Sequence, residues 1–200
     1  MSAPILVKTY AAPPFDEREI LRYAGSKEEE GISELLHSCM EEIKDKLVYK
    51  VCFQEFPLQI EGDSCHFEAF SCRSKGLAQC LNGCERVIIF AATVGIEIDR
   101  FIEKYSLLSP SRAVLMQAIG TERVEALCDI FCKDMQKEKG GLTSRFSPGY
   151  GDLSLQVQKE VASVLDCAKK IGVYLNESML MSPSKSVTAF VGLVGQVRVE

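Results

Sequence analysis

A continuous apolar run, Val87–Thr93, limits the fold of this 200-residue chain more than any other stretch. The run has the length of a strand, and it lacks the polar alternation of a strand that faces water on one side. The sequence therefore predicts a buried central strand, which other elements must cover. Gly95 follows it, and apolar residues at helical spacing over Ile98–Tyr105 predict that a helix comes next.

Five further stretches are predicted as helices, from apolar spacing or from the signals at their ends. They are Glu17–Ala24, Glu28–Val48, Ser74–Leu81, Pro110–Lys137 and Val157–Ile171. Asp16 begins a capping box before the first of them. Ser109 precedes a proline at the first helical position of the fourth, which is a strong helix start.

Alternating and β-branched runs predict two strand pairs. The first joins Tyr49–Phe56 to Ser64–Ser71, and the second joins Val173–Met181 to Ser186–Val199. Because helices and strands interleave without strict alternation, we predict an α+β fold with a mainly antiparallel sheet flanked by helices. The length suits a single domain over residues 1–200, in which residues 1–14 form an extended segment.

The composition argues against several classes of protein. No apolar run approaches the roughly twenty residues that cross a membrane, and we find no secretion signal before Pro14. The net charge is −5 and the basic residues are scattered, which argues against a nucleic-acid surface. We therefore expect a cytoplasmic protein that binds neither nucleic acid nor membrane.

Nine cysteines are many for this length, but their odd number fits reduced thiols better than a disulfide framework. Cys80 with Cys84, and Cys128 with Cys132, have a spacing that places both sulfurs on one face of a helix. A shared metal or a redox pair is one interpretation, and small buried apolar residues are the favoured one. Neither histidine lies in a cluster with zinc-ligand spacing, so we expect no metal site.

One loop, Arg145–Asp152, combines conformational and chemical signals. Pro148 fixes its own backbone angle, and the two glycines that follow it admit angles that other residues avoid. Arg145 offers a fork of donors that fits a carboxylate or a phosphate. Tyr150 offers a flat face for an adenine or a sulfonium cation. The loop is therefore the candidate binding site.

Two motifs resemble the activation domain of cobalamin-dependent methionine synthase, the part of that enzyme that binds S-adenosylmethionine. The first is Arg-x-x-Pro-Gly-Tyr at Arg145–Tyr150, and the second runs from Leu175–Ser178 into Met181–Pro183 and Ser186–Val187. Their order and spacing also match. The resemblance implies a long twisted antiparallel sheet with helices around it, which agrees with the pattern of elements.

The resemblance also implies a set of ligand-binding residues and no catalytic residue. The implied set is Arg145, Ser147, Tyr150, Gln156, Glu177 and Ser178. Arg145 would meet the amino-acid portion of S-adenosylmethionine, and the backbone of Ser147 would meet the adenosine portion, beside Tyr150. In the family, cobalt(I) of a cobalamin held by another domain takes the methyl group, so this domain only binds and aligns its ligand.

Some family positions are not matched, and some roles stay open. The N-terminal Tyr-x-Asp-Trp element is absent, and Lys139, next to Glu138, occupies the place of an acid six residues before Arg145. Each lost charged contact would remove about 1.5–3 kcal/mol of binding free energy. The structural alternatives are that Arg145 bonds helix carbonyls or pairs with Asp152, that Tyr150 only packs at the turn, and that Glu177 only ties its own turn.

Three hypotheses of function follow. In the first, the chain is a freestanding activation subunit that binds S-adenosylmethionine and presents it for reductive remethylation of the cobalamin of a partner methionine synthase. In the second, it is a docking module for a corrinoid protein or methyltransferase and has lost that ligand. In the third, it is a thiol or metal module built on the cysteine pairs. The extended N-terminal segment also suits a homodimer.

Overall fold

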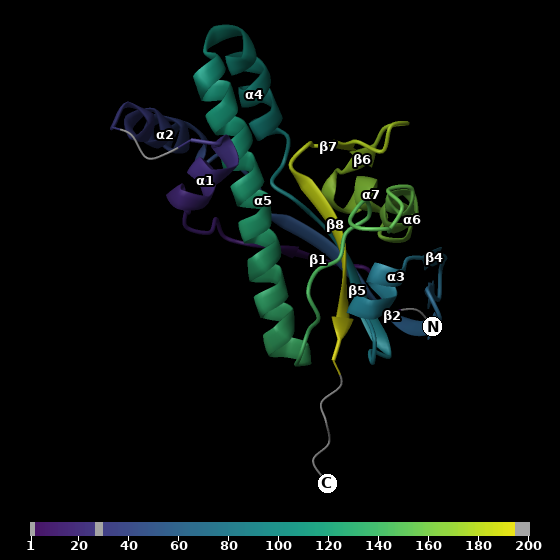
Figure 1. The fold of residues 1–200 in the computed structure, drawn as a ribbon. Coiled ribbons are helices and arrows are strands. Elements are labelled where there is room, and N and C mark those ends of the chain that lie inside the picture. Colours follow the sequence, from purple (N-terminus) through teal and green to yellow (C-terminus); the bar gives the residue numbers. More distant parts are fainter. Residues whose placement is uncertain (1–2, 27–29, 195–200) are drawn as a thin grey trace.

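The central strand predicted from the apolar run is confirmed. In the computed structural model, which describes residues 3–26 and 30–194, β5 spans Arg86–Thr93. It pairs antiparallel with β2 (Lys50–Glu61) on one side and with β8 (Ser186–Leu193) on the other. Every residue of β5 after Arg86 is buried. The strand is therefore covered on both faces (Figure 1).

The remaining strands of this sheet are arranged around β2. β3 (Ser64–Phe67) pairs with the second half of β2, and β4 (Ser71–Arg73) pairs with β3. β1 (Leu6–Thr9) pairs with the first half of β2, on the edge away from β5. All of these pairings are antiparallel, so the predicted α+β fold with an antiparallel sheet is confirmed.

Helices cover both faces of the sheet (Figure 1). One face carries α1 (Glu17–Ala24), α2 (Glu30–Ile43), α4 (Glu97–Leu108) and α5 (Pro110–Lys139), and the other carries α3 (Lys75–Cys80), α6 (Val157–Val164) and α7 (Cys167–Ile171). The bounds of α1 match the prediction, because Asp16 caps its start and Gly25 ends it in a left-handed conformation.

β5 divides its side chains between two cores. Because alternate residues of a strand point to opposite faces, Ile88 and Phe90 join the core under α5, while Val87 and Ile89 join the core under α6 and α7. Phe131 of α5 packs on Phe90, with 4.7 Å between ring centroids. This contact anchors the C-terminal third of α5 on the sheet.

The predicted C-terminal hairpin is wrong. β8 pairs with β5, whereas β6 (Tyr174–Leu175) forms a separate small sheet with β7 (Met181–Ser182). β8 is mostly buried, because its side chains join the cores on the two faces of the sheet. Its backbone pairs with β5 at one edge and bridges to Leu142 and Phe146 at the other. An exposed hairpin would leave its apolar residues in water. The end of the predicted strand lies outside the described residues.

The single helix predicted over Val157–Ile171 is two helices, α6 and α7. Asp166 lies between them with a φ of 47°, a left-handed conformation that a continuous right-handed helix does not contain. The break directs α7 toward β2, where Cys167 Sγ lies 3.9 Å from Cys52 Sγ. Local apolar spacing continues through the break, so the pattern alone did not reveal it.

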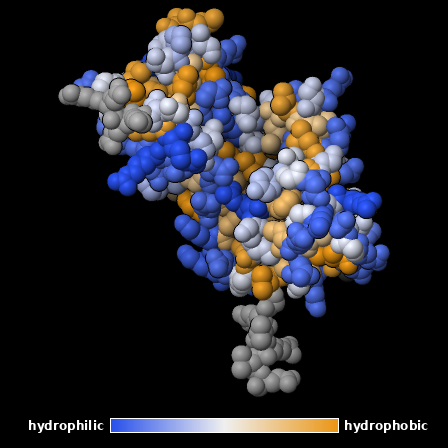
Figure 2. Space-filling view, viewed as in Figure 1, coloured by the Kyte–Doolittle hydropathy of each residue, from blue (hydrophilic) through white to orange (hydrophobic). Residues whose placement is uncertain are grey.

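The hairpin of α4 and α5 projects beyond the sheet and ends in an apolar cap (Figures 1 and 2). Leu107, Leu108 and Val114 are exposed there. Among the described helices, none combines the length and the apolar character needed to cross a membrane.

Candidate functional site

The turn predicted as a binding site lies at the outer edge of β8. Phe146 N donates to Phe190 O over 3.0 Å, and Phe190 N donates to Phe146 O over 2.8 Å. Gly149 and Gly151 have φ angles of 86° and 57°, which are the angles that favour glycine. The turn is therefore attached to the sheet at its start and bends back on itself directly afterwards.

Asp152 attaches the end of the turn to the first residues of α3. Its carboxylate accepts from Ser74 Oγ over 2.5 Å, from Lys75 N over 2.7 Å and from Gly76 N over 3.1 Å. A carboxylate at a helix start satisfies amides that have no partner within the helix. Asp152 therefore binds the start of α3, and the alternative in which it pairs with Arg145 is wrong.

We expect Asp152→Asn to destabilise the protein near neutral pH and to reduce its sensitivity to acid. The Ser74 hydroxyl, followed by the two amides, holds the pKa of Asp152 below its usual 3.8. A carboxyl with a lowered pKa stabilises the fold above its unfolded pKa, and this contribution disappears as the pH falls through the lowered value. Urea denaturation between about pH 7 and about pH 2 should show the difference between parent and variant shrinking below about pH 4.

Asp45→Asn is the matched control for this prediction, because Asp45 is exposed and its carboxylate accepts no hydrogen bond from the described residues. The control should leave stability nearly unchanged across the same range. A loss for Asp152→Asn that stays equal at every pH would contradict the role given to the ionised carboxylate.

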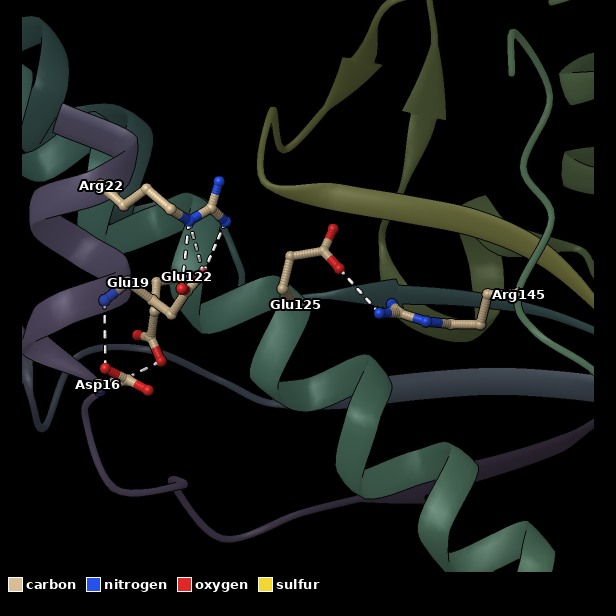
Figure 3. Close-up of polar contacts among 6 residues, drawn as sticks. All are labelled: Asp16, Glu19, Arg22, Glu122, Glu125 and Arg145. Atoms are coloured by element: carbon tan, nitrogen blue, oxygen red, sulfur yellow. Dashed lines mark hydrogen bonds and ion pairs between the residues drawn. The ribbon is translucent and has the colours of Figure 1, made fainter. Parts of the chain in front are cut away.

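Arg145 extends from the turn toward α5 (Figure 3). Its Nη2 lies 3.0 Å from Glu125 Oε2 and 2.9 Å from Asp129 Oδ1. Because Glu125 and Asp129 are four residues apart on a helix, they share one face of α5. The side chain of Arg145 is 27% exposed, so the pairs form at the protein surface rather than in the core.

A hollow of about 630 Å³ opens beside the turn, and we call it the turn hollow. It is lined by Glu125, Cys132, Thr143, Ser144, Arg145, Ser147, Tyr150 and Val187. Tyr150 is 67% exposed and packs edge-on against Phe146, with 5.3 Å between ring centroids. An exposed aromatic ring beside paired charges can bind a planar or cationic group.

A second hollow, of about 770 Å³, adjoins the first, and we call it the acidic hollow. Its lining comprises residues 13–19, Tyr23, Glu122, Glu125, Ala126, Asp129, Ile130, Lys133 and Arg145. Six of these residues are acidic and three are basic, so the hollow attracts cations. Arg145 and Glu125 line both hollows and therefore connect them.

A buried arginine holds the wall of the acidic hollow. Arg123 is fully buried and donates to Pro13 O over 2.5 Å and to Pro14 O over 2.7 Å. Its guanidinium also pairs with Glu122 over 2.5 Å and lies 4.1 Å from the centroid of the Phe15 ring. Through these contacts α5 fixes the segment that leads into α1.

The turn hollow contains three of the six residues implied by the resemblance, namely Arg145, Ser147 and Tyr150. Gln156 is exposed at the start of α6 and lines neither hollow. It comes four residues after Asp152, the last residue of the turn.

The other two implied residues, Glu177 and Ser178, are exposed in the loop between β6 and β7 and line neither hollow. Asn176 ties this loop, because its Oδ1 accepts from Ser178 N and from a second amide of the loop, both over 2.9 Å. Gln158 of α6 donates to Met179 O over 2.8 Å and holds the loop on the helix. Asn176 therefore performs the structural role considered for Glu177.

Glu125, Asp129 and Asp16 are site residues that the sequence did not reveal. The resemblance points to an acid six residues before Arg145, but Glu138 and Lys139 there pair with side chains of β1 and β2. The available signal was the helical spacing of two acids on one face of α5. The sequence marks Asp16 only as a helix cap, although its backbone N also donates to Glu122 of α5 over 3.4 Å (Figure 3).

The cysteines of α5 behave as buried thiols. Burial raises the pKa of Cys128 above its usual range and raises that of Cys132 to about 11. Such thiols are protonated at neutral pH, which makes them poor nucleophiles and poor metal ligands. In the part of the chain that the structure describes, no three His, Cys, Asp or Glu residues are grouped so as to hold a metal ion.

Comparison with known proteins gives a match among solved structures only. No family model matches the chain, and no match is found among curated proteins. Among solved structures, the chain is similar to the MetH reactivation domain in its crystal structure with bound AdoHcy, with a TM-score of 0.71 and 12% sequence identity. The match covers 100% of this chain and 81% of that one. The chain therefore has the fold of a methionine synthase activation domain, as the sequence motifs predicted.

Proposed function

We propose that this chain binds S-adenosylmethionine in the turn hollow. It would present the ligand, in the cytoplasm, for reductive remethylation of the cobalamin of a partner methionine synthase. The observation that carries the proposal is the convergence of Arg145, Tyr150 and Glu125 on one hollow. The fold supports it, because the MetH reactivation domain binds AdoHcy, which is S-adenosylmethionine without its transferable methyl group.

The charges around the turn hollow complement those of the ligand. S-adenosylmethionine carries a carboxylate, an ammonium and a sulfonium, and so has a net positive charge. Arg145 offers donors to the carboxylate, and Glu125 offers an acceptor to a cationic group. Tyr150 offers its ring to the adenine or the sulfonium. The acidic hollow adds a surrounding negative field, which favours a cationic ligand over a neutral one.

The residues of this chain would orient the methyl group rather than react with it. In the proposed reaction, the cobalt of the partner's cobalamin supplies the electron pair, so this chain needs no nucleophile of its own. Because this chain would hold the sulfonium in one orientation, its complex with the ligand would only need to align with the partner's cobalamin. Tyr150 is exposed at the rim, so a ligand beside it remains accessible to a partner.

Calorimetric titration tests the ligand half of this proposal. S-adenosylmethionine and AdoHcy are each titrated into the wild-type chain, and both should bind with saturation at one site. Adenosine is the control, because it lacks the amino-acid portion that Arg145 would contact. If neither S-adenosylmethionine nor AdoHcy gives heat at millimolar concentration, the proposal is contradicted.

The ion pairs of Arg145 favour a second candidate function. Glu125 and Asp129 already neutralise this guanidinium, as expected of a chain that has lost the ligand and serves only to dock on a corrinoid protein or methyltransferase. In that case the chain would co-purify with a corrinoid protein, Arg145→Ala would leave the complex intact, and S-adenosylmethionine would give no heat.

A further inference from the structure

Two thiols face each other in the core under α6 and α7, and the proposed function does not use them. Cys52 of β2 and Cys167, the first residue of α7, lie with their sulfurs 3.9 Å apart. Both side chains are buried, with exposed fractions of 0% and 1%. Because a disulfide joins sulfurs about 2 Å apart, an approach of about 2 Å would bring the two atoms to bonding distance.

The contact between the two sulfurs prepares one of them to react. A hydrogen bond with Cys167 lowers the pKa of Cys52, and the positive charge of Lys170 on α7 acts in the same direction. The same hydrogen bond raises the pKa of Cys167, so Cys52 loses its proton first. The thiolate is the nucleophilic form of cysteine.

A second facing pair provides a contrast. Cys65 and Cys72 lie directly opposite each other on β3 and β4. Burial raises the pKa of Cys65 to about 11 and that of Cys72 to about 12. Both thiols of this pair therefore stay protonated at neutral pH, and we expect them to react more slowly than Cys52.

The element that covers Cys167 is short and lies against a hollow. α7 has five residues, and it lies between Asp166 and Gly172, which are both in the left-handed conformation. A hollow of about 430 Å³, which we call the α7 hollow, is lined by Asp166, Ala168 and Val173 among others. Because Asp166 and Ala168 are the chain neighbours of Cys167, a local opening of α7 exposes this thiol to the α7 hollow. A small oxidant can reach the sulfurs by this route.

We propose that Cys52 and Cys167 are a redox-sensitive pair, which hydrogen peroxide converts into a disulfide that ties α7 to β2. The thiolate of Cys52 attacks one oxygen of the peroxide, the O–O bond breaks, and a sulfenic acid forms. The hydroxide that leaves takes up the proton that Cys52 released. The sulfur of Cys167 then attacks the sulfenic sulfur, and its proton leaves with the second hydroxide as water. The two thiols lose two electrons, and the peroxide gains them.

The disulfide would stabilise the folded chain. It would join residues that are 115 positions apart, and a cross-link of this length removes much of the conformational freedom of the unfolded chain. The oxidised chain should therefore unfold at a higher temperature than the reduced one. The inference does not depend on the proposed function, because neither cysteine lines the turn hollow or the acidic hollow.

Peptide mapping and thermal unfolding test the pair in the folded chain. The wild type is treated with hydrogen peroxide in the absence of denaturant, its remaining thiols are blocked, and it is digested without a reductant. The expected product is a disulfide-linked pair of peptides that contain Cys52 and Cys167. Circular dichroism should show that Tm rises by about 5–15 °C. Dithiothreitol should reverse the rise.

Two variants separate this pair from the other cysteines. In Cys167→Ala, peroxide should leave Tm unchanged. Cys39→Ala is the matched control, because Cys39 is also fully buried but lies on α2 in the other core, and its Tm should rise as that of the wild type does.

Three results would overturn the inference. They are the absence of the expected linked peptides from the oxidised wild type, a disulfide that joins Cys65 to Cys72 in their place, and an equal rise in Tm in Cys167→Ala. The peptide map of the wild type decides the matter even if Cys167→Ala does not fold.

Discussion

Arg123→Ala should lower the free energy of unfolding by about 3–5 kcal/mol, the largest loss of stability that we expect from one substitution at the site. The side chain is fully buried, and its removal leaves two backbone carbonyls without their donors. It also leaves the carboxylate of Glu122, which is 5% exposed, without its cationic partner. A buried charge that loses its partner is strongly destabilising. Denaturant unfolding followed by circular dichroism measures the loss.

Two further variants test the reason given for the effect of Arg123→Ala. Arg100→Ala removes an exposed arginine that pairs with Glu97 on α4, and it should cost less than about 1 kcal/mol. The double variant Glu122→Gln with Arg123→Met removes both buried charges, and it should recover part of the lost stability. A loss below about 1 kcal/mol for Arg123→Ala would show that Pro13 and Pro14 are held mainly by other contacts.

Arg145→Ala should weaken the binding of S-adenosylmethionine about a hundredfold or more. The substitution removes the donors that the ligand carboxylate would contact. It also leaves the carboxylates of Glu125 and Asp129 beside that site without their cation. Loss of attraction and gain of repulsion act in the same direction. Calorimetry on the wild type and the variant measures the ratio of dissociation constants.

Arg86→Ala is the control for Arg145→Ala, because Arg86 also pairs with an acid, Glu55, but lines neither hollow. It should bind the ligand as the wild type does. Arg145→Lys should recover only part of the affinity, because an ammonium cannot reproduce the two-pronged contact of a guanidinium. Wild-type affinity in Arg145→Ala would remove this residue from the binding site.

The elements predicted correctly are those whose signals are local. β5 is apolar at successive positions because both of its faces are covered, so its burial is recorded within the strand itself. The ends of α1 are set by Asp16 and Gly25, which are its immediate neighbours. The predicted hairpin gives β8 the wrong partner, because the choice between β5 and a nearby strand depends on residues far away in the chain. The left-handed conformation of Asp166 does not change the spacing of apolar residues, so that spacing does not predict the break between α6 and α7.

The sequence predicts the loop of the site, Arg145–Asp152, but not the residues of other elements that face it. The turn carries proline, glycine, arginine and tyrosine within one short stretch, so its conformation and its chemistry are both visible in the sequence. The partners of Arg145 come from α5, and they face the turn only because α5 packs on β5. Such facing pairs require the tertiary structure.

The backbone pairing of Phe146 with Phe190 affects how a ligand would be received. Ordering a mobile loop costs about 1–2 kcal/mol of conformational entropy for each residue. In this chain the first residues of the turn are ordered when the sheet forms, and the carboxylate that binds α3 orders the last. Folding thus bears the entropic penalty in advance, and affinity at this surface depends on the contacts themselves rather than on induced closure.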